Sequence, residues 1–249
     1  LDVLGWYKAL EDWQIDVDVV DGSIFKDQTA DQYEVLVLAA NDCYALDPAT
    51  QSEEGIAAWV KNGGMLLHGP MDLLAQASVG SRCLSHEKDA FECSGEKGML
   101  TGTQFGSFEE ENADVLAVWE TDEKPAIVKR TFGKGTVCEI GFFYGFEYTG
   151  RIAPHVPLTQ RNNELYPLTM LKKDPVGMLL EEKFGTTLTR KKGVERAEFE
   201  NGTVIVNHSS YPCRIDEPGT RYFQNPELYQ DLDSKILLPH MGVFIERKV

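Results

Sequence analysis

Two short apolar runs constrain the fold of this chain more than any other feature of its sequence. Residues 33–40 read YEVLVLAA, and residues 63–69 read GGMLLHG. A short, continuous apolar run is typical of a strand that is buried on both faces of a parallel sheet. Between the two runs, Trp59 and Val60 belong to a predicted helix that ends at Gly63 and Gly64. This alternation of strand and helix predicts a doubly wound α/β layer.

The flanking segments extend the same pattern. Apolar residues recur at helical spacing over residues 3–13, which predicts an amphipathic helix at the start of the chain. Residues 15–20 (IDVDVV) alternate between apolar and charged side chains, as a strand does. Three further strands are predicted in ADVLAVWE, KPAIVKRTF and GTVCEIGFF, the last two joined by a tight hairpin at Gly133-Lys134-Gly135. Residues 78–111 have no clear periodicity and predict covering loops or a short meander.

The last third of the chain has a different pattern. A Pro-rich polar passage, RIAPHVPLTQRNNELYP, marks a domain boundary, and Asp174-Pro175 caps a helix that ends near Gly185. VERAEF and TVIVN then flank Glu200-Asn201-Gly202, an Asn-Gly hairpin expected to need positive φ at both central residues. We therefore expect an α/β domain over 1–165, a connector helix over 166–185, and a small antiparallel β domain over 186–249.

Charge and cysteine content exclude several classes of partner. The net charge of −16 argues against nucleic acid and anionic membranes, because each phosphate contact requires Lys or Arg. No apolar run approaches the ~20 residues that a membrane span needs, and no secretory leader is recognisable. The five cysteines are odd in number and have no CxxC spacing, which predicts reduced thiols in a cytoplasmic protein.

The turn after MLLHG is the first place to look for chemistry. In α/β enzymes the carboxyl end of such a strand carries a nucleophile or a phosphate-binding loop. Here the turn offers Gly69, Pro70, Met71 and Asp72, with no Ser, Cys or Gly-rich cradle. Either the chemistry lies elsewhere in the chain, or this fold has none of its own.

Two other residues are weaker catalytic candidates. Cys43 follows the first apolar run and could pair with His68 or His155, but AANDCYALD lacks the small residues of a strained nucleophile elbow. Glu164 follows Asn163, and Asn-Glu is how many barrel glycosidases present their general acid. It lies in the Pro-rich connector, however, and the chain is too short for a barrel together with the β domain.

Metal and cofactor sites are not expected. The five histidines contain no i, i+4 pair and have no carboxylate cluster beside them. The acidic run FEEEN at 108–112 is read as a solvated loop rather than a Ca²⁺ site.

An aromatic run, GFFYGFEYTGR, follows the last predicted strand of the first domain. If it continues that strand, alternate rings face opposite ways, so about half of them stay outside the core. Such an exposed apolar patch would contact sugar or another subunit; alternatively, the remaining rings simply cover the end of the sheet. The candidates for this surface are Phe142, Phe143, Tyr144, Phe146 and Tyr148.

Taken in order, these segments resemble the second and third domains of family 42 β-galactosidases. The matching segments are YKALEDWQIDVDVV, YEVLVLAA, AAWVKNGGMLLHGPMD, KPAIVKRTFGKGTVCEIG, GVERAEFENGTVIVNHS and ILLPHMGVFIER. In those enzymes a catalytic barrel precedes a glutamine-amidotransferase-like, flavodoxin-like α/β trimerisation domain and a small β domain. The connector at 151–185 is longer than the family's.

The resemblance also explains the turn at 69–72. True amidotransferases carry Cys in a Gly-x-Cys-x-Gly elbow there and His-Pro-Glu after the last strand, whereas this chain reads HGPMD and GFFYGFEY. The resemblance therefore implies a non-catalytic assembly portion of a glycoside hydrolase, a homo-oligomer (a trimer by resemblance) and carbohydrate as a further partner. Two alternatives stay open: a free-standing amidotransferase-like enzyme using Cys43 or an unidentified acid, and a carbohydrate-binding module using the aromatic run.

Overall fold

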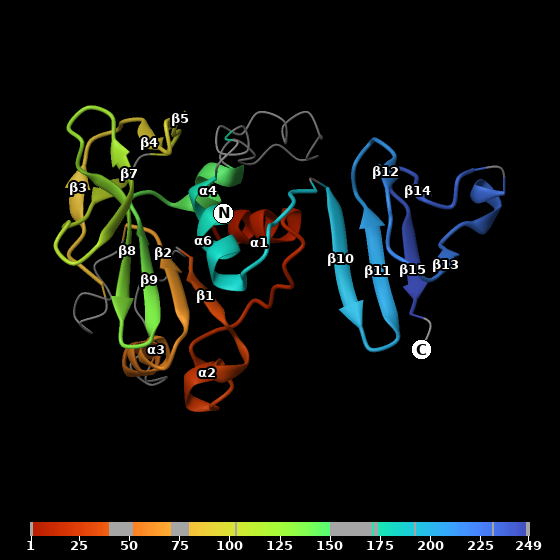
Figure 1. Cartoon of the computed structure of the whole chain (residues 1–249), viewed down its shortest axis with the longest axis horizontal. Coiled ribbons are helices and arrows are strands. Elements are labelled where there is room, and N and C mark those ends of the chain that lie inside the picture. Colours follow the sequence, from red (N-terminus) through yellow and green to blue (C-terminus); the bar gives the residue numbers. More distant parts are fainter. Residues whose placement is uncertain are drawn as a thin grey trace. The chain divides into compact units, whose positions relative to one another are not determined.

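The computed structural model describes residues 2–39, 52–70, 80–102, 104–149, 171, 174–191, 193–230 and 232–247 (Figure 1). The chain divides into two compact units. The N-terminal unit comprises residues 1–7 and 19–186, and the C-terminal unit comprises residues 8–18 and 187–249. Residues 8–18 therefore group with the C-terminal unit, a feature that the boundaries drawn from the sequence do not contain. No helix among the described residues is long and apolar enough to cross a membrane.

A seven-stranded mixed sheet forms the frame of the N-terminal unit. Its strands lie in the order β1-β2-β9-β8-β7-β4-β5. The first three are parallel and the remaining pairs are antiparallel. Their bounds are β1 Val35–Leu38, β2 Met65–His68, β9 Gly135–Ile140, β8 Pro125–Phe132, β7 Asp114–Trp119, β4 Phe91–Cys93 and β5 Glu96–Gly98. The chain is thus a mixed α/β protein, and both apolar runs that predicted parallel strands form them.

Helices and one small strand pair complete this unit. The strands β3 (Leu84–His86) and β6 (Phe105–Ser107) pair with each other, so the unassigned region of the sequence is a set of short strands. The helices are α2 Ser23–Lys26, the 3₁₀ helix η1 Ala30–Gln32, α3 Ser52–Lys61, α4 Tyr144–Thr149 and α6 Pro175–Phe184, together with the first residues of α1 Asp2–Asp12, whose remainder groups with the C-terminal unit. The predicted caps of α6 are confirmed: Asp174 accepts from the N–H groups of Val176 and Gly177, and Gly185 is left-handed with φ 63°.

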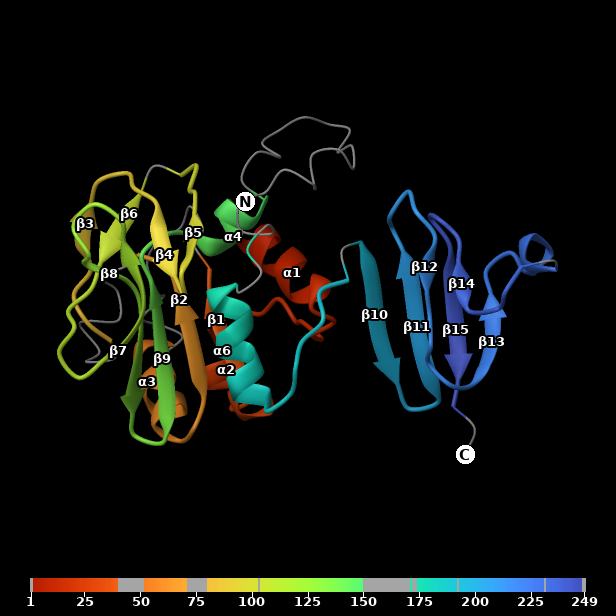
Figure 2. The same cartoon turned by 45° about the horizontal axis from the view of Figure 1, so that its top comes forward.

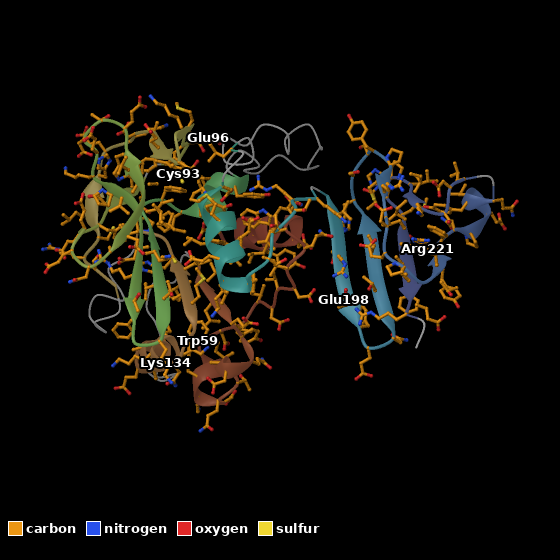
Figure 3. All side chains as sticks on the ribbon, in the orientation of Figure 1. Trp59, Cys93, Glu96, Lys134, Glu198 and Arg221 are labelled. Carbon is orange, nitrogen blue, oxygen red and sulfur yellow. The ribbon has the colours of Figure 1, made fainter. Side chains whose placement is uncertain are left out.

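The helix α3 is fixed to the parallel strands by apolar packing and by the predicted hairpin. Trp59 and Val60 bury against Leu66 of β2 and Val137 of β9. The turn between β8 and β9 lies at the end of this helix, where the N–H of Lys134 donates to the carbonyl of Lys61 at 2.9 Å. Figure 3 shows Trp59 and Lys134 close together at this junction. The Gly-Lys-Gly turn therefore joins the helix to the sheet as well as joining two strands.

The strand predicted at 15–20 does not form. Residues 15–20 belong to no ladder, and Val19 is 70% exposed. Alternation creates an amphipathic surface, but a strand also needs a partner edge for its backbone N–H and C=O groups. Residues 15–20 pair with no described strand, so the pattern alone is not sufficient.

The C-terminal unit is the predicted antiparallel β structure. Its main sheet has the order β10-β11-β15-β13, which Figure 2 shows side by side. These strands are β10 Val194–Phe199, β11 Gly202–Asn207, β15 Gly242–Glu246 and β13 Thr220–Phe223; β12 Cys213–Arg214 pairs with β14 Ile236–Leu237, and the 3₁₀ helix η4 spans Pro226–Tyr229. Ile205, Leu237 and Ile245 lie at the centre of its core.

The β10–β11 hairpin has a different turn from the one that the sequence predicted. Phe199 pairs with Gly202, so the two-residue loop is Glu200-Asn201, and neither of these residues nor Gly202 has a positive φ. Gly202 is required for space instead. A Cβ at this position would lie 2.3 Å from the carbonyl oxygen of Ile245 and 2.7 Å from the ring of Phe244.

We predict that Gly202→Val lowers the free energy of unfolding by about 1–3 kcal/mol, because the side chain must displace the neighbouring strand. Urea unfolding followed by fluorescence measures this change. Asn201→Gly is the matched control: a turn that needed positive φ at residue 201 would gain stability from this substitution, and we expect no gain. Stabilisation by Asn201→Gly, or no loss from Gly202→Val, would contradict the packing explanation.

Candidate functional site

The strand β2 presents its carboxyl end at the position where α/β enzymes carry chemistry. All four of its residues are buried, and it lies between β1 and β9 in the parallel part of the sheet. His68 is its last residue, and Gly69 and Pro70 begin the predicted degenerate elbow. The other elbow residues, Met71 and Asp72, lie outside the described residues, as do Cys43, His155 and Glu164.

A buried carboxylate faces His68 across the ladder. Glu139 of β9 is the register partner of His68, and their side chains are 0% and 1% exposed. The carboxylate of Glu139 accepts from the Nε of Arg130 at 2.7 Å, from the N–H of Ser81 at 2.6 Å and from the Ser81 hydroxyl at 3.1 Å. These charge-assisted contacts compensate for removing the carboxylate from water.

Arg130 extends this network to a third part of the chain. It lies on β8, and its two terminal nitrogens donate to the backbone carbonyls of Glu109 and Glu111. The acidic loop is therefore held through its main chain, while the side chains of residues 109–112 remain exposed. One guanidinium thus connects β9, β8 and the 109–111 loop.

His68 is held in its neutral form. Its Nδ1 lies 2.7 Å from the carbonyl oxygen of Gly69, and a carbonyl can only accept, so Nδ1 carries the proton. Its Nε2 is buried and has no hydrogen-bond partner among the described residues, and it lies 3.9 Å from the Oε1 of Glu139. Burial lowers the pKa of His68 below its usual value, against the opposing effects of the Glu139 charge and the Gly69 carbonyl.

The side chains of His68 and Glu139 are both buried. Gly80 lies directly over them, and a Cβ at Gly80 would be 2.8 Å from the Oε1 of Glu139 and 3.7 Å from the Nε2 of His68. The Ser81 hydroxyl is bound to the carboxylate rather than to the imidazole. Desolvation also raises the pKa of the neighbouring Cys138 thiol, which keeps it protonated. The arrangement therefore acts as an internal brace that holds residues 80–81 and 109–111 to the sheet.

Sequence reasoning singled out His68 but missed Glu139, Arg130 and Ser81. A signal for Glu139 was present, because it stands between Cys138 and Ile140 in a run that the parallel sheet buries on both faces. A charged residue in such a run requires a partner. Nothing local in the sequence identifies Arg130 or Ser81 as that partner.

The aromatic run is mostly core, and it does not continue β9 as a strand. The strand β9 ends at Ile140, and α4 begins at Tyr144, so strand alternation does not apply. Phe142, Tyr144 and Tyr148 are buried, while Phe143 and Phe146 are half-buried. Tyr144 packs on Trp6 of α1, with ring centroids 4.5 Å apart, and its hydroxyl donates to Asp174 at 2.8 Å. Only Phe143 and Phe146 keep surface for a partner.

The acid within this run is a second internal clamp. Glu147 is buried on α4 and accepts from the N–H and hydroxyl of Thr101 at 2.7 and 2.9 Å, and from the N–H of Gly102. Its oxygens are thus occupied by the loop before β6. Among the described residues, no group of three or more His, Cys, Asp or Glu side chains is arranged to hold a metal ion.

Comparison with known proteins identifies the fold. No protein-family model matches the sequence, and no curated protein matches it. Among solved structures, a catalytic mutant of Gan42B, a GH42 β-galactosidase from G. stearothermophilus, is similar with a TM-score of 0.61, 15% identity, and coverage of 99% of this chain and 36% of that one.

Two further β-galactosidases show the same relation. The enzyme from Bacillus circulans sp. alkalophilus has a TM-score of 0.61 at 15% identity. The match covers 99% of this chain and 37% of that enzyme. The polyextremophilic enzyme from the Antarctic haloarchaeon Halorubrum lacusprofundi has a TM-score of 0.62 at 16% identity. The match covers 98% of this chain and 35% of that enzyme. The resemblance to GH42 β-galactosidases is therefore confirmed for the fold, and the chain spans about a third of their length.

We predict that His68 makes the protein sensitive to mild acid. Because its pKa is lowered in the folded state, the unfolded chain binds a proton first as the pH falls below about 6.5. The free energy of unfolding should then fall by up to about 1.4 kcal/mol per pH unit from this group. In His68→Gln, the slope of unfolding free energy between pH 6.5 and 5 should be smaller by up to that amount. At pH 8, where His68 is neutral in both states, the difference in unfolding free energy between the two proteins measures the effect of the substitution on packing. Equal slopes for the two proteins between pH 6.5 and 5 would show that His68 accepts a proton in the folded state.

Proposed function

We propose that this chain is a non-catalytic assembly portion of a glycoside hydrolase of the GH42 β-galactosidase type. The observation that carries the proposal is that the structural match covers nearly all of this chain but only part of each β-galactosidase. The similarity spans 98–99% of this chain but only 35–37% of the β-galactosidase structures. A fold that recurs as about a third of longer enzymes is consistent with a part that supports a catalytic domain elsewhere.

The interior of the N-terminal unit supports a scaffold role. We propose that its sheet is the amidotransferase-like doubly wound layer of such enzymes, with His68 to Asp72 in place of the nucleophile elbow. At this elbow, the described residues supply a neutral buried imidazole and a carboxylate that is already bound by Arg130 and Ser81. A general base needs access to a proton on substrate, and these groups have none.

The partners follow as further proposals. We propose a homo-oligomer in a cytoplasmic carbohydrate-degrading enzyme that needs no cofactor in this portion, with the two domains near the boundaries 1–165 and 186–249. Phe143 and Phe146 are the members of the aromatic run that retain exposed surface. The ring of Phe143 also lies against Gly69, so the elbow and the candidate interface are adjacent.

We predict no hydrolase or amidase turnover by residues 1–249 alone. The measurement is release of nitrophenol from nitrophenyl galactosides, and of ammonia from glutamine, at high enzyme concentration. Cys43→Ala and Glu164→Gln are the matched variants for the two weaker catalytic candidates. Turnover by the unmodified chain that either variant abolishes would refute the non-catalytic proposal and favour a free-standing enzyme.

We also predict that the chain self-associates. A stable contact buries about 800 Å² per partner, and at ~0.15 M salt the repulsion from the net charge of −16 is screened beyond about 8 Å. Light scattering coupled to size exclusion should show an oligomer that Phe143→Ser with Phe146→Ser weakens. Phe199→Ser, at an exposed aromatic of the C-terminal unit, is the control and should leave the mass unchanged. A monomer at high micromolar concentration would count against assembly by this chain.

A further inference from the structure

The C-terminal unit contains a cavity of about 270 Å³. It is lined by Gln14 and by residues of the segment 191–217, all of which belong to this unit. Three of the lining residues, Val194, Ile205 and Ile215, are buried members of the apolar core. A protein cavity of about 150 Å³ admits one benzene ring. The larger cavity here therefore has room for one six-membered ring that carries substituents.

Gln14 brings an unsatisfied acceptor to the lining of this cavity. Its side-chain NH₂ group donates to the carbonyl oxygen of Glu11 at 2.8 Å and to that of Val194 at 2.6 Å. Because both partners can only accept, these contacts determine which end of the amide is nitrogen and which is oxygen. The Oε1 atom is buried and has no hydrogen-bond partner among the described residues. Gln14 therefore holds a carbonyl oxygen in a fixed orientation without a donor.

The backbone of Gln14 is also unusual. Its φ is 61°, two residues beyond the end of α1, where a left-handed residue is usually glycine. The helix closes there through bonds from the N–H of Gln14 to the carbonyl of Glu11 and from the N–H of Ile15 to the carbonyl of Leu10. Glycine would adopt this backbone with less strain. The contacts at this position thus engage the side-chain amide as well as the main chain.

Glu217 brings a second unsatisfied acceptor to the same lining. Its Oε2 atom is buried and has no hydrogen-bond partner in the part of the chain that the structure describes. Its Oε1 atom lies 3.8 Å from the Nε of Arg196, which is beyond hydrogen-bond distance. Buried acceptors are normally paired, and leaving one unpaired is costly. Two such oxygens in one cavity therefore call for a bound molecule that supplies donors.

The charged residues of the lining restrict the chemistry of that molecule. Lys191 and Arg214 are exposed, and Arg214 is paired with Asp216 at 2.8 Å. Burial raises the pKa of the Cys213 thiol in the lining, and the positive charge of Lys191 opposes this effect. A cationic ligand would be repelled by Lys191 and an anionic one by Glu217. A hydroxyl group suits both residues, because it donates to a carboxylate and accepts from an ammonium group.

We infer that this cavity binds a neutral polyol of the size of one pyranose ring. Its hydroxyl groups donate to the Oε1 of Gln14 and the Oε2 of Glu217, and the C–H groups of its ring pack against Ile205 and Ile215. The inference does not rest on the proposed assembly role, since it depends only on the cavity and its lining. A negative result in the tests below would leave that role untouched.

Protection of the Cys213 thiol tests the inference on residues 1–249. Alkylation by iodoacetamide is followed by mass spectrometry of the Cys213 peptide, with millimolar galactose, glucose or myo-inositol as the probes. At least one of these polyols should slow the alkylation of Cys213 in a saturable way. Tetrahydropyran, which has the pyranose ring without its hydroxyl groups, should not. Cys83, a half-buried thiol of the N-terminal unit, is the internal control and should react at an unchanged rate.

Three results would overturn the inference. An unchanged rate at Cys213 with all three polyols would mean that the cavity holds water only. Equal protection by tetrahydropyran would mean that the cavity recognises an apolar ring rather than hydroxyl groups. Equal slowing at Cys83 would mean that the polyols act on the whole protein and not at this cavity.

Variants of the lining identify the groups that hold the polyol. Glu217→Gln replaces a charged acceptor with a neutral amide and should raise the Kd of the protecting polyol about tenfold or more. Glu227→Gln makes the same change of charge at an exposed residue of the same unit and should leave the Kd unchanged. Lys191→Met, at an exposed position where folding is not at risk, should also raise the Kd, so a loss of fold in Glu217→Gln does not end the test. Wild-type affinity in Lys191→Met, or in a folded Glu217→Gln protein, would overturn the inference.

Discussion

Backbone hydrogen bonding along β1, β2 and β9 is the constraint on which the rest of the N-terminal unit depends. A parallel strand cannot satisfy its N–H and C=O groups alone, so the buried residues of β2 are stable only because ladders run along both of its edges. The same ladder sets His68 directly opposite Glu139 and sets Leu67 opposite Cys138. Register, rather than any local motif, therefore determines which side chains meet at the carboxyl end of the sheet.

Features set by neighbouring residues could be predicted from the sequence. The helix at 175–184 carries its signals at its own ends, in Asp174-Pro175 and Gly185, and it forms as expected. The β8–β9 hairpin is likewise specified by Gly133-Lys134, between strands that pair from Phe132 to Gly135. The antiparallel C-terminal sheet follows from alternation and a short loop, although Gly202 serves close packing rather than positive φ. Local chemistry is sufficient where the partner lies a few residues away.

Features set by distant partners could not be predicted in this way. Residues 15–20 have the alternation of a strand, but alternation does not supply the edge on which they would pair. A period of two predicts alternating rings at 142–148, whereas the chain forms a helix from Tyr144. Trp6 and Asp174 supply contacts to the buried Tyr144. Arg130 and Ser81 meet Glu139 only through the ladder and the loop over it. In each case the deciding contact is tertiary, which a periodic pattern does not contain.

The carboxylate of Glu139, beside the carboxyl end of β2, already has its hydrogen-bond donors in this protein. A carboxylate removed from water is stable only when donors replace its hydration, and here Arg130 and Ser81 supply them. A substrate group would have to displace one of these donors, and losing one partner of a buried ion pair costs about 3–5 kcal/mol. A reaction at this position would therefore have this free-energy cost added to its barrier. The same contacts hold the loops at 80–81 and 109–111 to the sheet.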